Sequence, residues 1–494
     1  MSQLKTPFLS QGAVPVHGPP IGFSQPQRTA FGKEPLELDG ILMFFAVFLV
    51  YSRFSEIFSM ATGFQLSYTI FIVLALVAFG SILNGRDLLG ATISGAMKYY
   101  TGFTVWMLLC VPLSSWRGGS VDMLRYQWIP AFLATVFAVT IIREERHFHI
   151  LAKVMAMSSM TIVAASFLLG QYSPSDGRLM FFSGSLRNSN DLSVLLCSGL
   201  PFFFMPLLGK DWGRFGKIIA VPAVLLHVII VLRTGSRAAM LSLILMLVLL
   251  FLFTSITRKV MILVLIGILS VAGAVMTPDV VIARLKSGIG MEDPLVAAEA
   301  IASRLQRTEK FWHSVSLTLE HPIFGVGPGT YLSAQAKADT DAGRRADWLT
   351  SHNTLTQVSS ETGLPGFFLY TAAAMVALFR LNRARQICTQ YPFMKSEANL
   401  TIAFQLSLCG IFAANLFGSN AYVFYMPMMV GLCSKLHSQI LQKYEILRST
   451  SPTVPARQVP AIPATVLSPP VPAVTPEPPR RPMSSFRAQF KRTP

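Results

Sequence analysis

The segment MLSLILMLVLLFLF (residues 240–253) decides the fold class of this chain, because it contains no charged side chain. With its flanking residues the segment reaches about 20 residues, the length at which a helix crosses a hydrocarbon core of roughly 30 Å. A helix also satisfies its own backbone hydrogen-bonding groups, which lipid cannot do. The segment therefore predicts a transmembrane helix.

Similar apolar blocks recur along the chain, for example ILMFFAVFLVY (41–51) and IFIVLALVAFGSIL (70–83). Of the 494 residues, 52% are hydrophobic and only 13% are charged. A soluble domain carries roughly 25% charged residues, because its surface must face water. Buried helices of a large soluble protein would show polar faces at helical spacing, and these blocks lack them. The chain is predicted to be an all-α, polytopic membrane protein.

The apolar blocks predict about twelve transmembrane helices, each long enough to cross a bilayer. They are placed at residues 38–52, 66–84, 98–115, 122–142, 148–170, 190–208, 215–233, 236–256, 258–276, 354–381, 397–418 and 419–437. Short loops rich in Lys and Arg lie on the cytoplasmic side of a membrane, and one set of loops carries most of these residues. Assigning that set to the cytoplasm also places both termini there.

Several arginines fall on the opposite, outer side by this assignment. They are Arg178, Arg187, Arg233, Arg237, Arg304 and Arg307. Arginine at these positions opposes the topological rule, so we suspect a functional requirement for it.

The two ends of the chain differ in composition from the rest. Residues 1–36 are rich in Pro, Gly and Gln, and residues 441–494 are proline-rich and basic. Both are predicted to be disordered cytoplasmic tails around a transmembrane domain at 37–440. The net charge of +17 suits the anionic headgroups of membrane lipids, and no nucleic acid partner is expected.

One outer segment, residues 277–353, is long enough to form a small domain. Its middle, residues 302–327, has apolar side chains at helical spacing and predicts an amphipathic helix along the outer membrane face. His321-Pro322 and the Gly-rich turn 325–329 are expected to end this helix. The segment leads directly into the tenth predicted span.

Short motifs stand at the two ends of this outer segment. His352-Asn353 is followed, after nine residues, by Gly363-Leu364-Pro365-Gly366. Upstream, Arg307 and Phe311 precede Pro322-x-x-Gly325-x-Gly327. The eighth predicted span begins with Ser236-Arg237. The Asn-rich stretch RNSNDL (187–192) leads into the sixth predicted span and overlaps its first residues.

In this order the motifs resemble those of the O-antigen ligase and O-antigen polymerase superfamily of bacterial membrane glycosyltransferases. That superfamily carries a histidine followed by Asn, Ser or Gln, then nine residues and Gly-x-x-Gly. Upstream it carries an arginine, an aromatic residue and Pro-x-x-Gly-x-Gly. One departure is that the aromatic residue is usually Trp, whereas Trp312 sits one place late. The resemblance spans residues 36–440.

The resemblance implies a GT-C-like fold with one long periplasmic loop, in the bacterial inner membrane. It implies an inverting, metal-independent enzyme without a cofactor. Such an enzyme transfers a glycan from undecaprenyl pyrophosphate to an acceptor hydroxyl on the periplasmic side. The acceptor stays open between the lipid A core (a ligase), another lipid-linked repeat (a polymerase) and a protein side chain.

His352 is the candidate general base, because an imidazole with a pKa near 6.5 accepts a proton at neutral pH. Guanidinium groups suit the departing pyrophosphate, since they bind phosphate oxygens through bidentate hydrogen bonds. Arg237 and Arg307 are the first candidates for that role, with Arg304 and Arg187 as seconds and Arg233 as the alternative to Arg237. Asn353, Gly325, Gly327, Gly363 and Gly366 are the structural positions of the motifs.

Each assignment has a structural alternative. The His352-Asn353 pair can cap the helix that follows, and Asn353 is well suited to that. Arg237 can extend its side chain to the membrane interface, and Arg307 can lie on a solvated helix face. Asp339-Thr340-Asp341 has the DxD pattern of metal-dependent sugar transferases, but we interpret it as a solvated loop and predict no metal site.

A secondary transporter or a flippase for lipid-linked oligosaccharides is the alternative function. Transporters place polar and charged groups at the bilayer midplane, on broken helices. Here the predicted spans hold few acidic residues at their centres, and the polar residues cluster at the outer end. The sequence therefore favours the transferase.

Overall fold

The computed structural model describes residues 37–450 apart from 64–65, 84, 86, 175–176, 182–183, 210–211, 278–280, 283–293 and 347. The predicted N-terminal tail and most of the predicted C-terminal tail lie outside these residues. So does the side chain of Arg304, although its backbone is described. The chain forms two compact units, Met1–Tyr444 and Glu445–Pro494. The candidate site and both cavities discussed below belong to the first unit.

The described chain is helical apart from one short hairpin. The α-helices are α1 (Leu38–Tyr51), α2 (Phe54–Thr62), α3 (Leu66–Leu83), α4 (Leu88–Ile93), α5 (Met97–Cys110), α6 (Arg117–Met123), α7 (Ile129–Ile141), α8 (Glu145–Leu169), α9 (Ser189–Gly199), α10 (Phe204–Leu208), α11 (Gly213–Arg233), α12 (Arg237–Phe253), α13 (Ile256–Met276), α15 (Pro294–Glu320), α16 (Tyr331–Asp341), α17 (Thr354–Gln390), α18 (Lys395–Asn415) and α19 (Tyr425–Thr450). Short helical turns are η1 (Val111–Leu113), the π-helix η2 (Leu124–Trp128), η3 (Ser185–Arg187), η4 (Leu200–Phe203) and η6 (Pro392–Met394). Strands β1 (Gln171–Tyr172) and β2 (Leu179–Met180) pair antiparallel.

The all-α, polytopic prediction is confirmed. Among the described residues, seven helical segments are long and apolar enough to cross a membrane. They are Arg117–Ile141, Glu145–Leu169, Ser189–Leu208, Gly213–Arg233, Ile256–Gly273, Thr354–Gln390 and Pro392–Asn415. Three shorter apolar helices are Leu38–Tyr51, Thr69–Gly80 and Arg237–Phe253. The total of about twelve spans and their orientation stay predictions.

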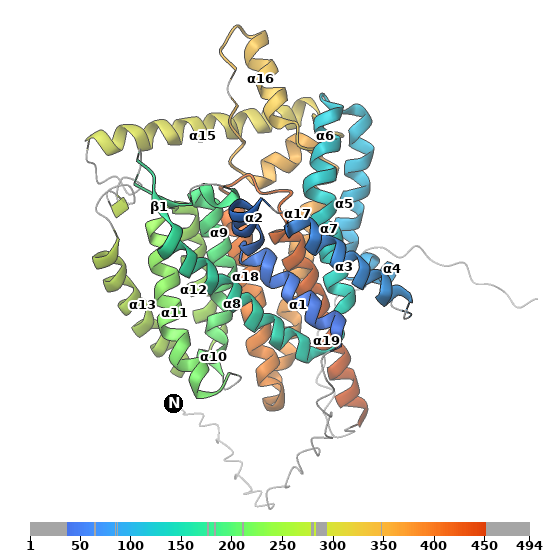
Figure 1. Cartoon of the computed structure of the whole chain (residues 1–494), viewed down its shortest axis with the longest axis vertical. Coiled ribbons are helices and arrows are strands. Elements are labelled where there is room, and N and C mark those ends of the chain that lie inside the picture. Colours follow the sequence, from blue (N-terminus) through green and yellow to red (C-terminus); the bar gives the residue numbers. More distant parts are fainter. Residues whose placement is uncertain are drawn as a thin grey trace, which may run out of the picture. The chain divides into compact units, whose positions relative to one another are not determined.

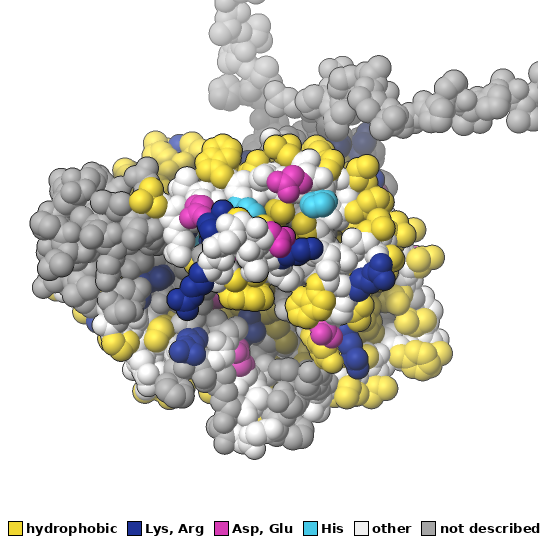
Figure 2. Space-filling view, turned by 90° about the horizontal axis from the view of Figure 1, so that it is seen from above, with side chains coloured by type: hydrophobic (Ala, Val, Ile, Leu, Met, Phe, Trp, Pro, Cys, Tyr) yellow, Lys and Arg dark blue, Asp and Glu magenta, His cyan; other side chains and the backbone are white. Residues whose placement is uncertain are grey.

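The long helices form a bundle, and α15 lies across one end of it with α16 beyond (Figure 1). We call this end of the bundle the α15 end. Helix α18 packs against α9, α12 and α17 and is buried along most of its length, so it is the central helix of the bundle. Seen from above, the α15 end carries charged and polar side chains, with apolar side chains at its rim (Figure 2).

The outer segment contains more helix than its composition predicts. Helix α15 ends at Glu320, immediately before His321-Pro322, as the sequence predicts. Asp339-Thr340-Asp341, interpreted above as a solvated loop, instead form the last residues of α16. The reason is that α16 buries Tyr331 and Ala336 on one side, and Tyr331 packs with Leu317 of α15 and Val326.

Two further boundaries differ from the prediction. The last predicted span starts at 419, but α19 starts at Tyr425, because residues 416–424 form a turn. Helix α19 also continues to Thr450, past the predicted domain boundary at 440. The β1–β2 hairpin was not predicted, since its strands are too short to show a pattern.

Candidate active site around His352

His352 lies between α16 and α17 in an unusual backbone conformation. Its φ angle is 54°, in the left-handed region that few residues other than glycine adopt. The backbone N–H donates a hydrogen bond of 2.9 Å to the Ser419 hydroxyl, in the turn between α18 and α19. Strained residues persist only where the surrounding structure holds them, and they cluster at functional sites. The conformation therefore marks His352 as a functional candidate independently of the motif.

Asn353 alone provides the cap of α17. Its side-chain oxygen accepts hydrogen bonds from the N–H groups of Leu355 (2.9 Å) and Thr356 (3.1 Å). Thr354 adds a second tie to the α18–α19 turn, because its hydroxyl donates to the Gly418 carbonyl at 2.8 Å. The capping alternative thus applies to Asn353 and leaves the half-buried His352 imidazole without a part in it.

The environment of His352 favours the neutral imidazole. Burial lowers the pKa of His352 below its ordinary value, and the positive charge of Arg307 lowers it further. Arg307 belongs to α15, so this helix brings a guanidinium close to the histidine from across the outer segment. A neutral imidazole next to a cation is suited to take a proton beside a bound anion.

The Gly-rich turn 325–329 docks on a break in α17. Pro365 has no N–H, so the carbonyl of Glu361, four residues earlier, lacks its helical partner. That carbonyl accepts instead from Gly327 N–H at 3.0 Å, and the Ser360 carbonyl accepts from Val326 N–H at 2.9 Å. In return, Leu364 N–H donates to the Pro322 carbonyl at 2.8 Å. The backbone groups freed by the break are thus satisfied by the turn and by the Pro322 carbonyl before it.

Two glycines permit this backbone-to-backbone contact. Gly363 has a φ of 70°, and a Cβ atom built there would lie 2.0 Å from the Ile323 carbonyl oxygen. Gly325 has a φ of 65°, and its Cβ would lie 2.3 Å from the Glu361 carbonyl carbon. Only glycine fits both the conformation and the space. The Pro-x-x-Gly-x-Gly and Gly-x-x-Gly motifs therefore meet at one place in the fold.

Glu361 is a residue of this contact that motif analysis does not single out. Its side chain is 2% exposed and accepts hydrogen bonds from the N–H groups of Gly329 (2.9 Å) and Tyr331 (3.2 Å). The Tyr422 hydroxyl donates to it as well. One signal was present in the sequence: an acidic residue near the start of an apolar span needs partners. Glu361 links α16, α17 and the α18–α19 turn.

Arg237 opens α12, directly after a turn that a second arginine holds in place. Arg178, 9% exposed, donates to the Thr234 carbonyl at 2.7 Å and to the Asn190 side chain at 2.8 Å. The Ser236 hydroxyl caps α12 by accepting from Ala239 N–H at 3.4 Å. The half-buried Arg237 is therefore carried by a fixed turn at the α15 end of the bundle.

The remaining candidate arginines are placed differently. Arg233 donates to the Met276 carbonyl at 3.2 Å, and its guanidinium lies 5.9 Å from the Phe167 ring centroid. These contacts hold it between α8 and α13. Arg187 is exposed in η3, and the side chain of Arg304 lies outside the described residues. Among the predicted arginines whose side chains the structure describes, Arg307 is the one whose charge acts on His352.

The DxD pattern does not present two open carboxylates. Asp339 is buried and accepts from Arg344, whose Nε and Nη2 lie 3.1 and 2.8 Å from one carboxylate oxygen. Asp341 is exposed at the end of α16. Within the described part of the chain, no group of three or more His, Cys, Asp or Glu side chains is arranged to hold a metal ion.

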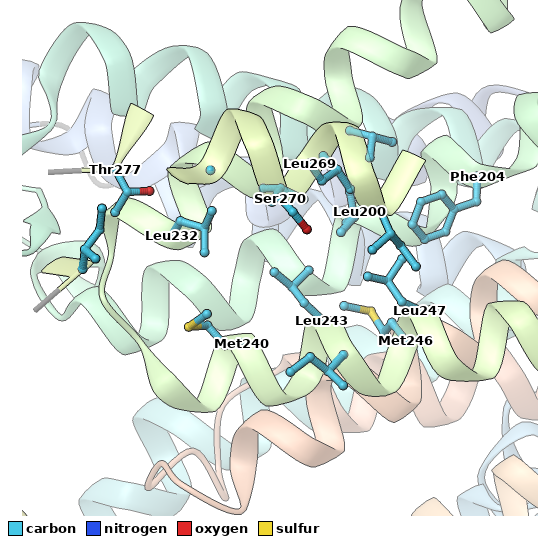
Figure 3. A pocket seen from close by; sticks show the side chains of 16 residues that line it. Leu200, Phe204, Leu232, Met240, Leu243, Met246, Leu247, Leu269, Ser270 and Thr277 are labelled. Atoms are coloured by element: carbon cyan, nitrogen blue, oxygen red, sulfur yellow. The ribbon is translucent and has the colours of Figure 1, made fainter. Parts of the chain in front are cut away.

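An apolar pocket of ≈ 610 Å³ lies between α11, α12 and α13 (Figure 3). Leu232, Met240 and Leu243 are among its lining residues, and Thr277 stands at one end. The Thr277 hydroxyl is buried and has no hydrogen-bond partner among the described residues. This end of the pocket adjoins the helix termini that carry Arg233 and Arg237.

The fold is a helical bundle with several membrane-spanning segments, and α15 and the loop that carries His352 lie at one end of it. These features define a polytopic membrane protein with a candidate site at the α15 end. Residues 222–371 match the family model described as O-antigen ligase (Wzy_C). The chain therefore carries an O-antigen ligase family domain, which reaches from within α11 to within α17.

The matched family is an enzyme family of membrane proteins that act in polysaccharide and lipopolysaccharide biosynthesis on lipid-linked glycans. The match includes Arg233, Arg237, Arg307, His352 and the glycines of both motifs. No curated protein matches the chain.

Proposed function

We propose that the chain is an inverting, metal-independent glycosyltransferase. It moves a glycan from undecaprenyl pyrophosphate to an acceptor hydroxyl at the periplasmic face of a bacterial inner membrane, as an O-antigen ligase or as a polymerase of polysaccharide repeats. The observation that carries the proposal is His352, held in a left-handed conformation beside the charge of Arg307. The α15 end of the bundle is then the periplasmic end.

In this proposal the neutral imidazole of His352 accepts the proton of the acceptor hydroxyl. The acceptor oxygen attacks the anomeric carbon from the face opposite the pyrophosphate, so the configuration at that carbon inverts. The bond between the carbon and the phosphate oxygen breaks, and undecaprenyl pyrophosphate leaves with the electron pair. General base catalysis of this kind contributes typically 10²–10⁴-fold to the rate.

The arginines stabilise the leaving group. Arg237 and Arg307 hold the pyrophosphate oxygens, with Arg304, Arg187 and Arg233 as further candidates at the same end. Fixed cationic donors aimed at developing charge are often the largest contribution to catalysis. The turn held by Arg178 supports this role for Arg237, since it fixes the backbone directly before the first residue of α12.

The pocket of Figure 3 supports a lipid-borne donor. Its walls are apolar along α11, α12 and α13, while its Thr277 end adjoins the helix termini with Arg233 and Arg237. An isoprenoid chain in this pocket places its pyrophosphate near those arginines. Burial of apolar chain surface contributes about 0.8 kcal/mol for each CH₂ group.

The experiment that tests the function is a transfer assay in proteoliposomes. The purified chain receives a lipid-linked glycan and an acceptor, lipid A core in one arm and a second lipid-linked repeat in the other. We expect glycan transfer in one arm, in EDTA as well as in Mg²⁺. Movement of the lipid-linked glycan across the bilayer without transfer would identify a flippase instead. Transfer that stops in EDTA and returns with Mg²⁺ would bring Asp339 and Asp341 back into the site.

A further inference from the structure

A second cavity, of ≈ 730 Å³, lies on another side of the bundle, between α1, α3 and α7. Its walls are apolar along all three helices, with Val47, Ile70, Leu74 and Ala134 among the lining residues. Because the lining helices also expose apolar side chains such as Phe45 and Ile72, the cavity belongs to the part of the protein that faces lipid. Its contents are therefore expected to be apolar.

The polar residues of this cavity gather at one end. Arg53 and Ser185 lie there, after α1 and in η3, together with Arg125, Tyr126 and Gln127 of the π-helix η2. The wider turn of a π-helix is common at functional sites, and here three consecutive residues line the cavity. The cavity is thus apolar along its length and cationic at one end.

Arg53 is held firmly at that end. Its Nη2 and Nε lie 2.5 and 3.2 Å from the Tyr425 hydroxyl oxygen, and its guanidinium lies 5.2 Å from the Phe424 ring centroid. Glu56 lies 3.6 Å away and is itself bound to Ser185, whose hydroxyl donates to it at 2.8 Å. Like His352, Arg53 has a φ of 54°. Arg125 also lines the cavity and is exposed, with its guanidinium 5.2 Å from the Tyr126 ring centroid.

The turn between α18 and α19 lines the polar end of the cavity and also contacts His352. Tyr422, Val423 and Phe424 line the cavity. They follow Ser419, which accepts the hydrogen bond from the His352 backbone, by only a few residues. A ligand whose polar head lies at Arg53 therefore directs that head toward the loop that holds the candidate base.

We infer that this cavity binds the lipid chain of a second, polyprenyl-phosphate-linked substrate, with its phosphate at Arg53 and Arg125. An apolar cavity with a cationic end matches a lipid that has a single long chain and an anionic head. The inference rests on the proposed function, since the pocket of Figure 3 is there assigned to the donor. It makes the acceptor lipid-borne as well, which is what a polymerase of lipid-linked repeats requires.

A binding experiment tests this inference without measuring transfer. The purified full-length chain in detergent is titrated with undecaprenyl phosphate, and bound lipid is counted by native mass spectrometry, with phosphatidylglycerol as the competitor. Ala134→Phe fills the cavity from α7, and Ala164→Phe on the exposed side of α8 is its matched control. Arg125→Gln removes the exposed cation, and Arg117→Gln at the start of α6 is its control.

Ala134→Phe and Arg125→Gln are each expected to weaken binding of one undecaprenyl phosphate by about tenfold or more. The phenylalanine occupies the space of the lipid chain, and the glutamine removes a charge-assisted contact to the phosphate. Both control variants should bind as the parent chain does. Equal binding by all four variants, or displacement by phosphatidylglycerol at equal concentration, would overturn the inference. Since Arg125 is exposed, its variant keeps the test valid if Ala134→Phe fails to fold. If the parent chain shows the expected binding pattern here but transfers no glycan in the proteoliposome assay, only the proposed function is contradicted.

Discussion

The backbone N–H of His352 donates a hydrogen bond of 2.9 Å to the Ser419 hydroxyl, across 67 positions of the chain. This bond joins the start of α17 to the turn between α18 and α19, and it helps to hold His352 at a φ of 54°. The imidazole is thereby presented from a fixed backbone rather than from a flexible loop. Precise placement of a catalytic group accounts for a large part of enzymatic rate acceleration.

The first prediction concerns the pH dependence of transfer. Burial and Arg307 both disfavour the imidazolium, so the pKa of His352 lies below 6.5 and the base form persists to lower pH. Activity is present above this pKa and is lost as the pH falls through it. The acid limb of kcat/KM should therefore lie below pH 6.5. Arg307→Gln removes the positive charge and should move the limb to higher pH. An acid limb at the same pH in both proteins would show that the charge of Arg307 does not act on the pKa of the base.

The second prediction concerns Arg237. Arg237→Lys keeps the charge but loses the bidentate guanidinium, so kcat should fall by roughly 10–100-fold if two charge-assisted hydrogen bonds to phosphate are reduced to one. Arg214→Lys is the matched control, since Arg214 is exposed at the other end of the bundle, at the start of α11. Equal tolerance of lysine at both positions would make Arg237 an interfacial anchor.

The third prediction concerns the contact between the two glycine motifs. Gly363→Ala should strongly destabilise the protein, because its Cβ would lie 2.0 Å from the Ile323 carbonyl oxygen. Gly343→Ala is the control: its φ is 69°, close to the 70° of Gly363, but nothing lies within 4 Å of the added Cβ. The free energy of unfolding of the control should therefore fall only by the cost of placing alanine in a left-handed conformation, about 1 kcal/mol. Thermal unfolding in detergent measures the difference, and similar Tm values for both variants would argue against the close contact.

The fourth prediction concerns orientation. A membrane-impermeant maleimide should label Thr340→Cys, on the exposed side of α16, in intact spheroplasts. Arg214→Cys, at the start of α11, should react only after permeabilisation. The five native cysteines provide the background signal, and four of them are buried. The opposite pattern would place the α15 end, and with it the candidate site, in the cytoplasm.

Much of the fold follows from the sequence, because its main determinant is local. A block such as residues 240–253 predicts its own helix, and α15 ends where His321-Pro322 predicts. Helix α16 was missed because its stabilising contacts are tertiary: Tyr331 packs on residues of α15 and of the Gly-rich turn. Composition alone makes this segment look like a loop.

The sequence predicts the site only where the residues of a motif lie close together in the chain. The motif identifies His352 and Asn353, but Ser419, which holds His352, lies too far along the chain for any spacing to reveal. Arg178 was noted as an arginine on the unexpected side, and its hydrogen bonds to Thr234 and Asn190 give it a structural role. Nothing local in the sequence connects Arg53 with Tyr425.

The most direct test of the central claim is the transfer rate of His352→Asn. Asparagine is among the residues that tolerate a left-handed backbone, so the variant should fold with a normal Tm while lacking the base. His321→Asn is the control, because His321 is exposed at the end of α15. We predict that His352→Asn lowers kcat by roughly 10²–10⁴-fold and loses the acid limb of the pH profile, and that His321→Asn transfers normally. A well-folded His352→Asn protein with a transfer rate close to that of the parent chain would contradict the account.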